Sequence, residues 1–138
     1  MRDLGRAFTR AIPVASQADP IWSRLPAGDG GKIEVLIRVD DSGRIGGFEP
    51  THRDPPKHLV DLVKRTVAYL EVGTFALRGQ VGAGAEVLAL SARLTDEAAS
   101  DDELEFKFDG KRGKASFRQA SGRRVDIDVR VVRVDRAP

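Results

Sequence analysis

Apolar and polar residues alternate one by one along several stretches of the chain, and this period of two predicts β-strands. The clearest stretch is 32–40, and the alternation resumes over 45–50 after the turn sequence "DDSG". A third strand is expected at 85–95, and three further strand signals lie within 103–136. On the first strand the shared apolar face consists of Ile33, Val35, Ile37 and Val39.

Two of these strands carry a local irregularity. Gly46 and Gly47 weaken the second strand and predict a bulge or a close packing contact. In the last strand, Val132 and Val134 fall on the opposite phase from the valines before them, which indicates either a bulge or a second buried face.

Apolar residues at helical spacing predict an amphipathic helix between the second and third strands. Asp54 is expected to cap it, Pro55 or Pro56 to begin it and Gly73 to end it. Its apolar stripe must pack on other parts of the chain, most simply on the preceding hairpin. The stripe consists of Leu59, Val63, Val67 and Leu70.

Residues 2–25 also have a helical pattern. Pro13 is expected to interrupt this helix, and the sequence Asp19-Pro20 to start it again.

The order of these elements predicts an α+β fold of two layers, in which an amphipathic helix packs on a mostly antiparallel sheet. A length of 138 residues fits a single domain spanning 1–138. Within it we distinguish an N-terminal helical segment (1–25), a core of hairpin, helix and strand (26–95), and a C-terminal β-meander (103–136).

Positive charge is concentrated in the C-terminal part of the chain. Residues 104–138 contain ten Lys and Arg against five Asp and Glu, whereas the remainder contains thirteen against sixteen. This distribution suggests an interaction module whose basic C-terminal sheet binds an acidic protein, a nucleic acid or a lipid surface. The candidate patch comprises Lys111, Arg112, Lys114, Arg118, Arg123 and Arg124.

The sequence offers little for catalysis, so we predict a non-enzymatic protein with no catalytic residues, metal ligands or cofactor. There is no cysteine, and His52 and His58 are spaced poorly for a metal site. "GDGGK" at 28–32 precedes a strand instead of a helix, so a phosphate-binding loop is not expected. Phe108 and Phe117 alternate with charged residues as core positions do, which makes nucleic acid an unlikely partner.

The segments "DPIW", "GGKIEVLIRVDDSGRIGGF" and "LVDLVKRTVAYLEVGTFAL", together with the strand that follows, resemble the C-terminal domain of TonB-type energy transducers. The resemblance covers about residues 18–95. It implies a periplasmic domain that is attached to the inner membrane through an N-terminal anchor, which this chain lacks along with any secretory signal. We therefore expect the excised end of a longer protein.

The resemblance also implies how a partner binds. Such domains pair a peptide of an outer-membrane transporter with the edge of the third strand, here 85–95, which is β-augmentation. An envelope protein is the corresponding partner here, and a dimer is left open. The implied contacts are Glu86, Val87, Ala89, Ser91 and Arg93.

The chain also departs from that family. The usual Tyr-Pro before the first strand is absent, and residues 104–138 continue past the family's usual end. If the additional strands pair with 85–95, they cover the edge that a transporter peptide would use. The sequence therefore leaves two binding modes open: strand pairing at 85–95, or binding of a partner by the basic C-terminal sheet.

Overall fold

The computed structural model describes residues 3–40, 45–72, 84–96, 106–119 and 122–136. Residues 41–43 of the predicted turn "DDSG" (40–43) and the predicted helix end at Gly73 lie outside these residues. The described elements are α1 (Asp3–Ser16), α2 (Ile21–Arg24), β1 (Gly28–Val39), β2 (Ile45–Pro50), α3 (Lys57–Val72), β3 (Gly84–Thr95), β4 (Phe106–Phe108), β5 (Arg112–Arg118) and β6 (Arg124–Arg136).

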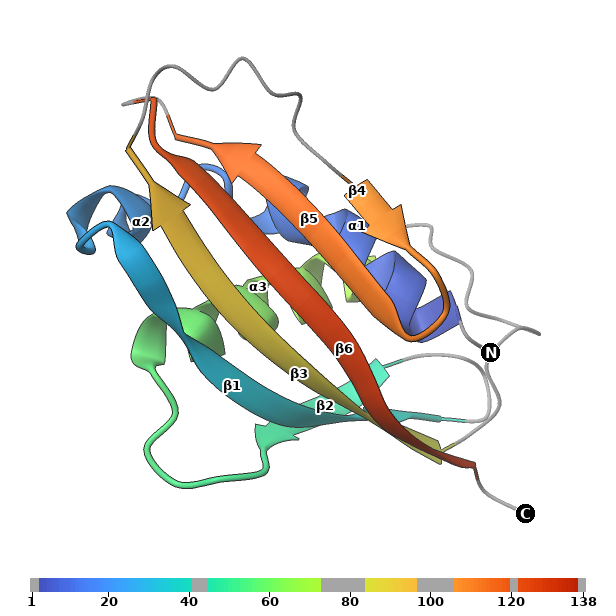
Figure 1. Ribbon diagram of the computed structural model, residues 1–138. Helices are drawn as coiled ribbons and strands as arrows, with labels where there is room; N and C mark the ends of the chain where they lie inside the picture. The colour runs from blue at the N-terminus through green and yellow to red at the C-terminus, as the bar shows by residue number, and fades with distance from the viewer. Residues whose placement is uncertain (1–2, 41–44, 73–83, 97–105, 120–121, 137–138) are drawn as a thin grey trace.

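The six strands form one sheet in the order β2-β1-β3-β6-β5-β4, and every neighbouring pair is antiparallel (Figure 1). The predicted α+β fold with an antiparallel sheet is thereby confirmed. The C-terminal strand β6 lies inside the sheet, because it pairs with β3 along its whole length and with β5 on its other side.

The two long helices, α1 and α3, lie side by side against one face of the sheet (Figure 1). Because side chains alternate along each strand, its apolar side chains point to this face. There they form the core together with the apolar stripes of both helices. The predicted stripe of α3 is buried as expected. Its four residues, Leu59, Val63, Val67 and Leu70, are between 0% and 5% exposed.

Trp22 closes one end of this core. Its side chain is 0% exposed, and its ring meets Phe117 and His58 edge to face, with ring centroids 5.8 Å and 5.6 Å apart. The short helix α2 therefore connects the N-terminal helix to both layers, because Phe117 belongs to β5 and His58 to α3.

Both predicted strand irregularities are β-bulges. Arg38 pairs with Gly47 and Val39 with Ile45, so Gly46 is the additional residue in β2. In β6 the pairing passes from Val131 to Arg133, so Val132 is the additional residue there. The bulge in β6 explains the change of phase, since one inserted residue shifts the alternation by one position.

The predicted interruption at Pro13 is wrong, because α1 continues through it to Ser16. A proline inside a helix costs about 3 kcal/mol, whereas burying one large apolar side chain contributes roughly 1.5–3 kcal/mol. Leu4, Phe8 and Ile12 of α1 are each 0% exposed, so the gain from packing exceeds the local cost.

The start of α3 also differs from the prediction. Asp54 has a left-handed φ of 53° and precedes the helix by three residues, so it does not cap it. The helix begins at Lys57, and the carbonyl of Pro56 accepts the N–H groups of Leu59 and Val60 at 3.0 Å each. No helix in the described residues is long and apolar enough to cross a membrane.

Candidate functional site

The face of the sheet opposite α1 and α3 is not covered by another described element (Figure 1). Because side chains alternate across a strand, this open face receives the polar positions of β1, β3, β5 and β6. Among the described residues it is therefore a continuous surface on which a partner can lie.

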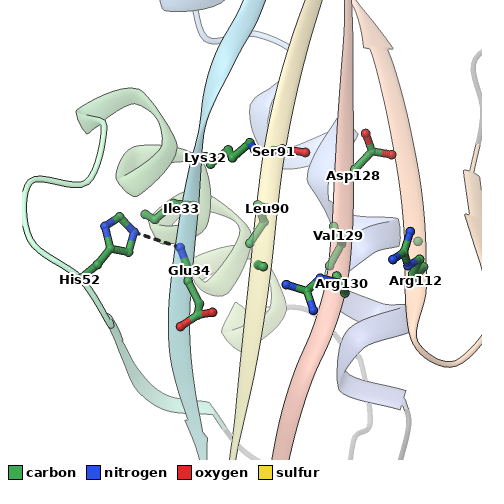
Figure 2. A pocket seen from close by; sticks show the side chains of 12 residues that line it. Lys32, Ile33, Glu34, His52, Leu90, Ser91, Arg112, Asp128, Val129 and Arg130 are labelled. Atoms are coloured by element: carbon green, nitrogen blue, oxygen red, sulfur yellow. Dashed lines mark hydrogen bonds between the residues drawn. The ribbon is translucent and has the colours of Figure 1, made fainter.

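The open face has a hollow of about 560 Å³ near its middle (Figure 2). Its floor is low because β3 presents the small residues Ala89 and Ser91 there, between longer side chains on both sides. The side chains that rise around this floor are Lys32, Glu34, His52, Arg112, Asp128 and Arg130.

Charged residues cross the hollow in two rows. The first row runs from Lys32 through Ser91 to Asp128. The second row runs from Glu34 through Ala89 to Arg130. Adjacent strands are about 4.8 Å apart, so the two charges of a row lie roughly 10 Å from each other. Within each row the two charges do not form an ion pair with each other.

Every basic side chain that β5 directs to the open face lies directly opposite another basic residue. The pairs are Arg112 with Arg130, Lys114 with Lys107, and Arg118 with Arg124, although Lys114 also lies opposite the acidic Asp128 on β6. A like-charged pair at directly opposite positions costs on the order of 0.5 kcal/mol. In the described part of the chain, Arg112 and Arg130 form no ion pair with an acidic residue.

The hairpin tip before Arg112 is held by Asp109. Its Oδ1 accepts the N–H groups of Arg112 at 2.8 Å and Lys111 at 2.9 Å. These two bonds, with that of Arg112 the stronger effect, lower the pKa of the Asp109 carboxyl below its ordinary value of 3.8. The turn thus fixes the backbone from which Arg112 projects.

On the other side of the hollow, residues after β2 hold Glu34 in place. The hydroxyl of Thr51 donates to Glu34 Oε2 at 2.6 Å, and the N–H of Thr51 donates to the Glu34 carbonyl at 2.9 Å. The N–H of Glu34 donates to His52 Nε2 at 3.1 Å, so this nitrogen acts as an acceptor (Figure 2). Both histidines bond to β1, since His58 Nε2 also lies 2.5 Å from the Gly30 carbonyl.

The structure separates the residues that the resemblance implied as partner contacts. Val87, Ala89, Ser91 and Arg93 face the open side of the sheet, but Val87 is 2% exposed, so the expectation that it is an exposed contact is wrong. Glu86 does not face this side, because it pairs with the inward-facing Ile37 and is 1% exposed. The expectation that Glu86 lies on the exposed face is therefore wrong.

The strand pairing implied by the resemblance does not have a free edge at β3. β1 occupies one side of β3 and β6 the other, and the pairing with β6 extends from Gly84 to Thr95. The backbone donors and acceptors of β3 are already used, so an incoming peptide cannot be added there. The additional C-terminal strands thus cover this edge, which was one of the two outcomes that the sequence left open.

The six residues of the predicted basic patch do not form one surface. Arg112, Lys114 and Arg118 follow one another on the open face, and Lys111 is exposed at the hairpin tip. Arg124 faces the same side but is 7% exposed and is paired with Asp126 at 3.0 Å.

Arg123 lies apart from this group. It binds Asp96 at 2.6 Å and donates to the carbonyls of Trp22 and Leu25. Its guanidinium therefore ties α2 to the end of the sheet and is not available to a partner.

The described aromatic residues of the C-terminal strands face the helices. Phe106 and Phe108 pair with the inward positions Ala115 and Gly113, and Arg10 and Arg6 stack on their rings at 4.9 Å and 5.4 Å. Phe117 is 1% exposed. Within the described residues, no group of acidic or histidine side chains is arranged to hold a metal ion.

Four charged residues that define the hollow were not among the predicted contacts: Lys32, Glu34, Asp128 and Arg130. Their outward direction was readable from the alternation in each strand. Their proximity was not, because it depends on β1 and β6 flanking β3, and these strands are far apart in the sequence.

Comparison of the chain with protein-family models, with curated proteins and with solved structures gives no match. The proposals below therefore rest on the geometry of the domain.

Proposed function

We propose that this domain is a non-enzymatic protein-interaction module, and that its open face binds acidic groups of a protein partner. The observation that carries the proposal is the pair Arg112 and Arg130, two exposed like charges at directly opposite positions beside a hollow. Such a pair is unfavourable in the isolated domain. A carboxylate placed between two guanidinium groups removes the repulsion and gains charge-assisted hydrogen bonds.

A protein partner fits the open face better than a nucleic acid does. Sites for single-stranded nucleic acid combine positive charge with exposed aromatic rings, and the described aromatic residues of β4 and β5 face the helices. Glu34 and Asp128 also stand among the basic residues of the hollow, so the open face carries both signs of charge. A protein surface that carries both signs of charge matches this arrangement.

Binding on the face also fits better than strand addition at an outer edge. β2 has six residues, including two glycines and Pro50, and β4 has three residues. Short edge strands with glycine or proline accept additional strands poorly. An envelope partner, as implied by the resemblance to TonB-type domains, would accordingly meet the open face.

A labelled polyglutamate peptide provides a direct test by fluorescence anisotropy. We expect the wild type to bind it with an affinity that falls as salt rises, because exposed charges are screened. The variant Arg112→Glu/Arg130→Glu should lose this binding. The matched control is Lys57→Glu/Lys64→Glu, which makes the same change of charge at exposed positions on α3 and should lose little.

Equal loss of affinity in both variants would reduce the effect to net charge and contradict the proposal. Folding is checked with Arg130→Ala, which removes one member of the like-charged pair. We expect this variant to unfold at the same or a slightly higher urea concentration than the wild type, while its affinity for the peptide falls.

A further inference from the structure

The two charged rows of the hollow have opposite polarity. In the first row the β1 residue is basic and the β6 residue acidic, as Lys32 and Asp128. In the second row the signs are reversed, as Glu34 and Arg130. β3 lies midway between β1 and β6, so both rows are centred on its small residues.

This arrangement is complementary to itself under a two-fold rotation. A rotation by 180° about an axis parallel to β3, in front of the open face, lays β1 of one copy over β6 of the other. Each row then lies over the same row of the second copy, with the order of its β1 and β6 residues exchanged. Lys32 meets Asp128 of the second copy, and Glu34 meets Arg130 of the second copy.

We propose that the partner bound on the open face is a second copy of this chain, forming a two-fold symmetric dimer through β1, β3 and β6. The proposal rests on the function proposed above and names the partner of that same site. Each of the two contacts occurs twice in such an interface, which gives four ion pairs across it.

The dimer also accounts for the pair Arg112 and Arg130. Arg112 is the β5 neighbour of Arg130, so both guanidinium groups lie near the position where Glu34 of the second copy arrives. The hydroxyl of Thr51 already holds Oε2 of that carboxylate at 2.6 Å. One carboxylate thus meets two like charges whose repulsion the monomer leaves uncompensated.

The shape and size of the face allow this contact. Ala89 and Ser91 lie on the axis at the hollow, so the strands can approach there while the longer side chains extend across it. Arg93 also lies on the axis and would face Arg93 of the second copy, so the favourable contacts are those around the hollow. Strands of 12 residues make a three-stranded face about 40 Å long and 15 Å wide. Full overlap of the two faces would bury at most roughly 1,200 Å², compared with the roughly 1,000 Å² expected of a specific interface.

Charge reversal with mixing is the decisive experiment, read by sedimentation velocity across a dilution series. We expect the wild type to dimerise more strongly at low salt than at high salt. Lys32→Asp places two like-charged contacts in the interface, and Asp128→Lys does the same with the opposite sign. Each variant alone should dimerise at least roughly tenfold more weakly than the wild type.

Mixing the two variants should restore the dimer. In the mixed pair, the aspartate introduced at position 32 of one chain meets the lysine introduced at position 128 of the other. The unchanged Asp128 of the first chain meets the unchanged Lys32 of the second, so both contacts are again of opposite charge. The double variant Lys32→Asp/Asp128→Lys should also dimerise alone. The controls Lys64→Asp and Asp61→Lys make the same changes on α3 and should leave dimerisation unchanged.

A wild type that stays monomeric at every concentration, or single variants that dimerise as it does, would overturn the dimer. The function proposed above is judged separately, by the polyglutamate peptide. Lys32→Asp retains Arg112 and Arg130, so it should still bind the peptide when it no longer dimerises. Peptide binding by a monomeric wild type would leave the site in place and assign it to a different acidic protein.

Discussion

Two Arg–Asp pairs on β6 show how burial changes the contribution of the same kind of ion pair to the free energy of unfolding. Arg124 and Asp126 are 3.0 Å apart with side chains 9% and 12% exposed, and Ser116 also donates to Asp126 at 2.5 Å. Arg133 and Asp135 have the same spacing along the strand and are 2.8 Å apart, but are 58% and 52% exposed. An exposed pair contributes little, whereas removing one member of a buried pair leaves an uncompensated charge.

We expect Asp126→Ala to lower the free energy of unfolding by about 3 kcal/mol, because Arg124 and Ser116 lose their shared acceptor. Asp135→Ala is the matched control and should change it by less than about 0.5 kcal/mol. Urea unfolding monitored by circular dichroism measures both. Equal effects of the two substitutions would show that burial does not govern these pairs.

Two exposed carboxyl groups should titrate at unusually low pH for different reasons. Hydrogen bonding to the Arg123 side chain lowers the pKa of Asp96 below 3.8, and the backbone N–H groups of Arg112 and Lys111 lower that of Asp109. A pKa lowered by folding stabilises the folded state above the ordinary value, and this stabilisation is lost as the pH falls through the lowered pKa.

We expect Arg123→Gln to return the pKa of Asp96 towards 3.8 and to leave that of Asp109 low. Titration of both carboxyl groups by NMR provides the measurement, with Asp109 as the internal control. A simultaneous rise of both pKa values would point to a general change of the fold instead of the loss of one contact.

At the scale of elements, α1 approaches the sheet closely at the β4–β5 hairpin. A Cβ on Gly113 would lie 2.7 Å from a ring carbon of Phe108 and 3.0 Å from the carbonyl oxygen of Lys107. Gly5 of α1 meets the same ring, with a Cβ position 2.9 Å from it. Glycine is needed at these positions for space, and the helix and hairpin pack together for that reason.

Gly113→Ala should therefore lower the free energy of unfolding by about 1–3 kcal/mol, since the added methyl group meets a backbone atom that cannot move independently. Gly46→Ala is the control, because nothing lies within 4 Å of its Cβ position. Thermal unfolding by calorimetry compares the two. A Gly113→Ala protein as stable as the control would show that the hairpin moves freely away from α1.

The elements themselves were largely predictable because their signals are local. Alternation identified the inward residues Ile33, Val35, Ile37 and Val39 of β1, and a bulge was one of the two alternatives predicted at Gly46 and Gly47 and near Val132. The predictions were wrong at residues whose placement depends on packing against parts of the chain that are distant in the sequence. Pro13 stays inside α1 because the helix buries Phe8 and Ile12, and Glu86 is buried although it is charged.

At the scale of the whole molecule, the order of strands determines the site and was not predictable from local patterns. The hollow requires β1 and β6 as the neighbours of β3, and β6 follows β3 in the sequence by about 30 residues. Alternation specifies which side chains point outward, but it does not specify which strands pair. The sequence therefore predicted basic residues on the sheet and did not predict that Lys32 and Asp128 share a row.

The same strand order implies that residues up to Thr95 and the C-terminal strands after them build one shared core. Val125, Ile127 and Val129 of β6 are 0–1% exposed and pack with residues of β1 and β3. A chain that stops after Thr95 should lose cooperative unfolding, because the inner face of β3 loses its neighbour. A chain that stops after Val134 should keep it.

Urea unfolding of both truncated chains tests this expectation. A cooperative transition in the chain ending at Thr95 would show that its hairpin, helix and strand fold without the C-terminal strands. In that case the edge of β3 would also be open in the shorter protein.

The central position of β6 has a consequence for synthesis in the cell. β1, β2, α3 and β3 leave the ribosome before β6, and translation adds roughly 40 residues to complete it, at about 5–20 residues per second. For several seconds each nascent chain presents an unpaired β3 edge beside apolar side chains. Chaperone binding or slow translation over residues 97–136 would therefore influence the yield of this domain.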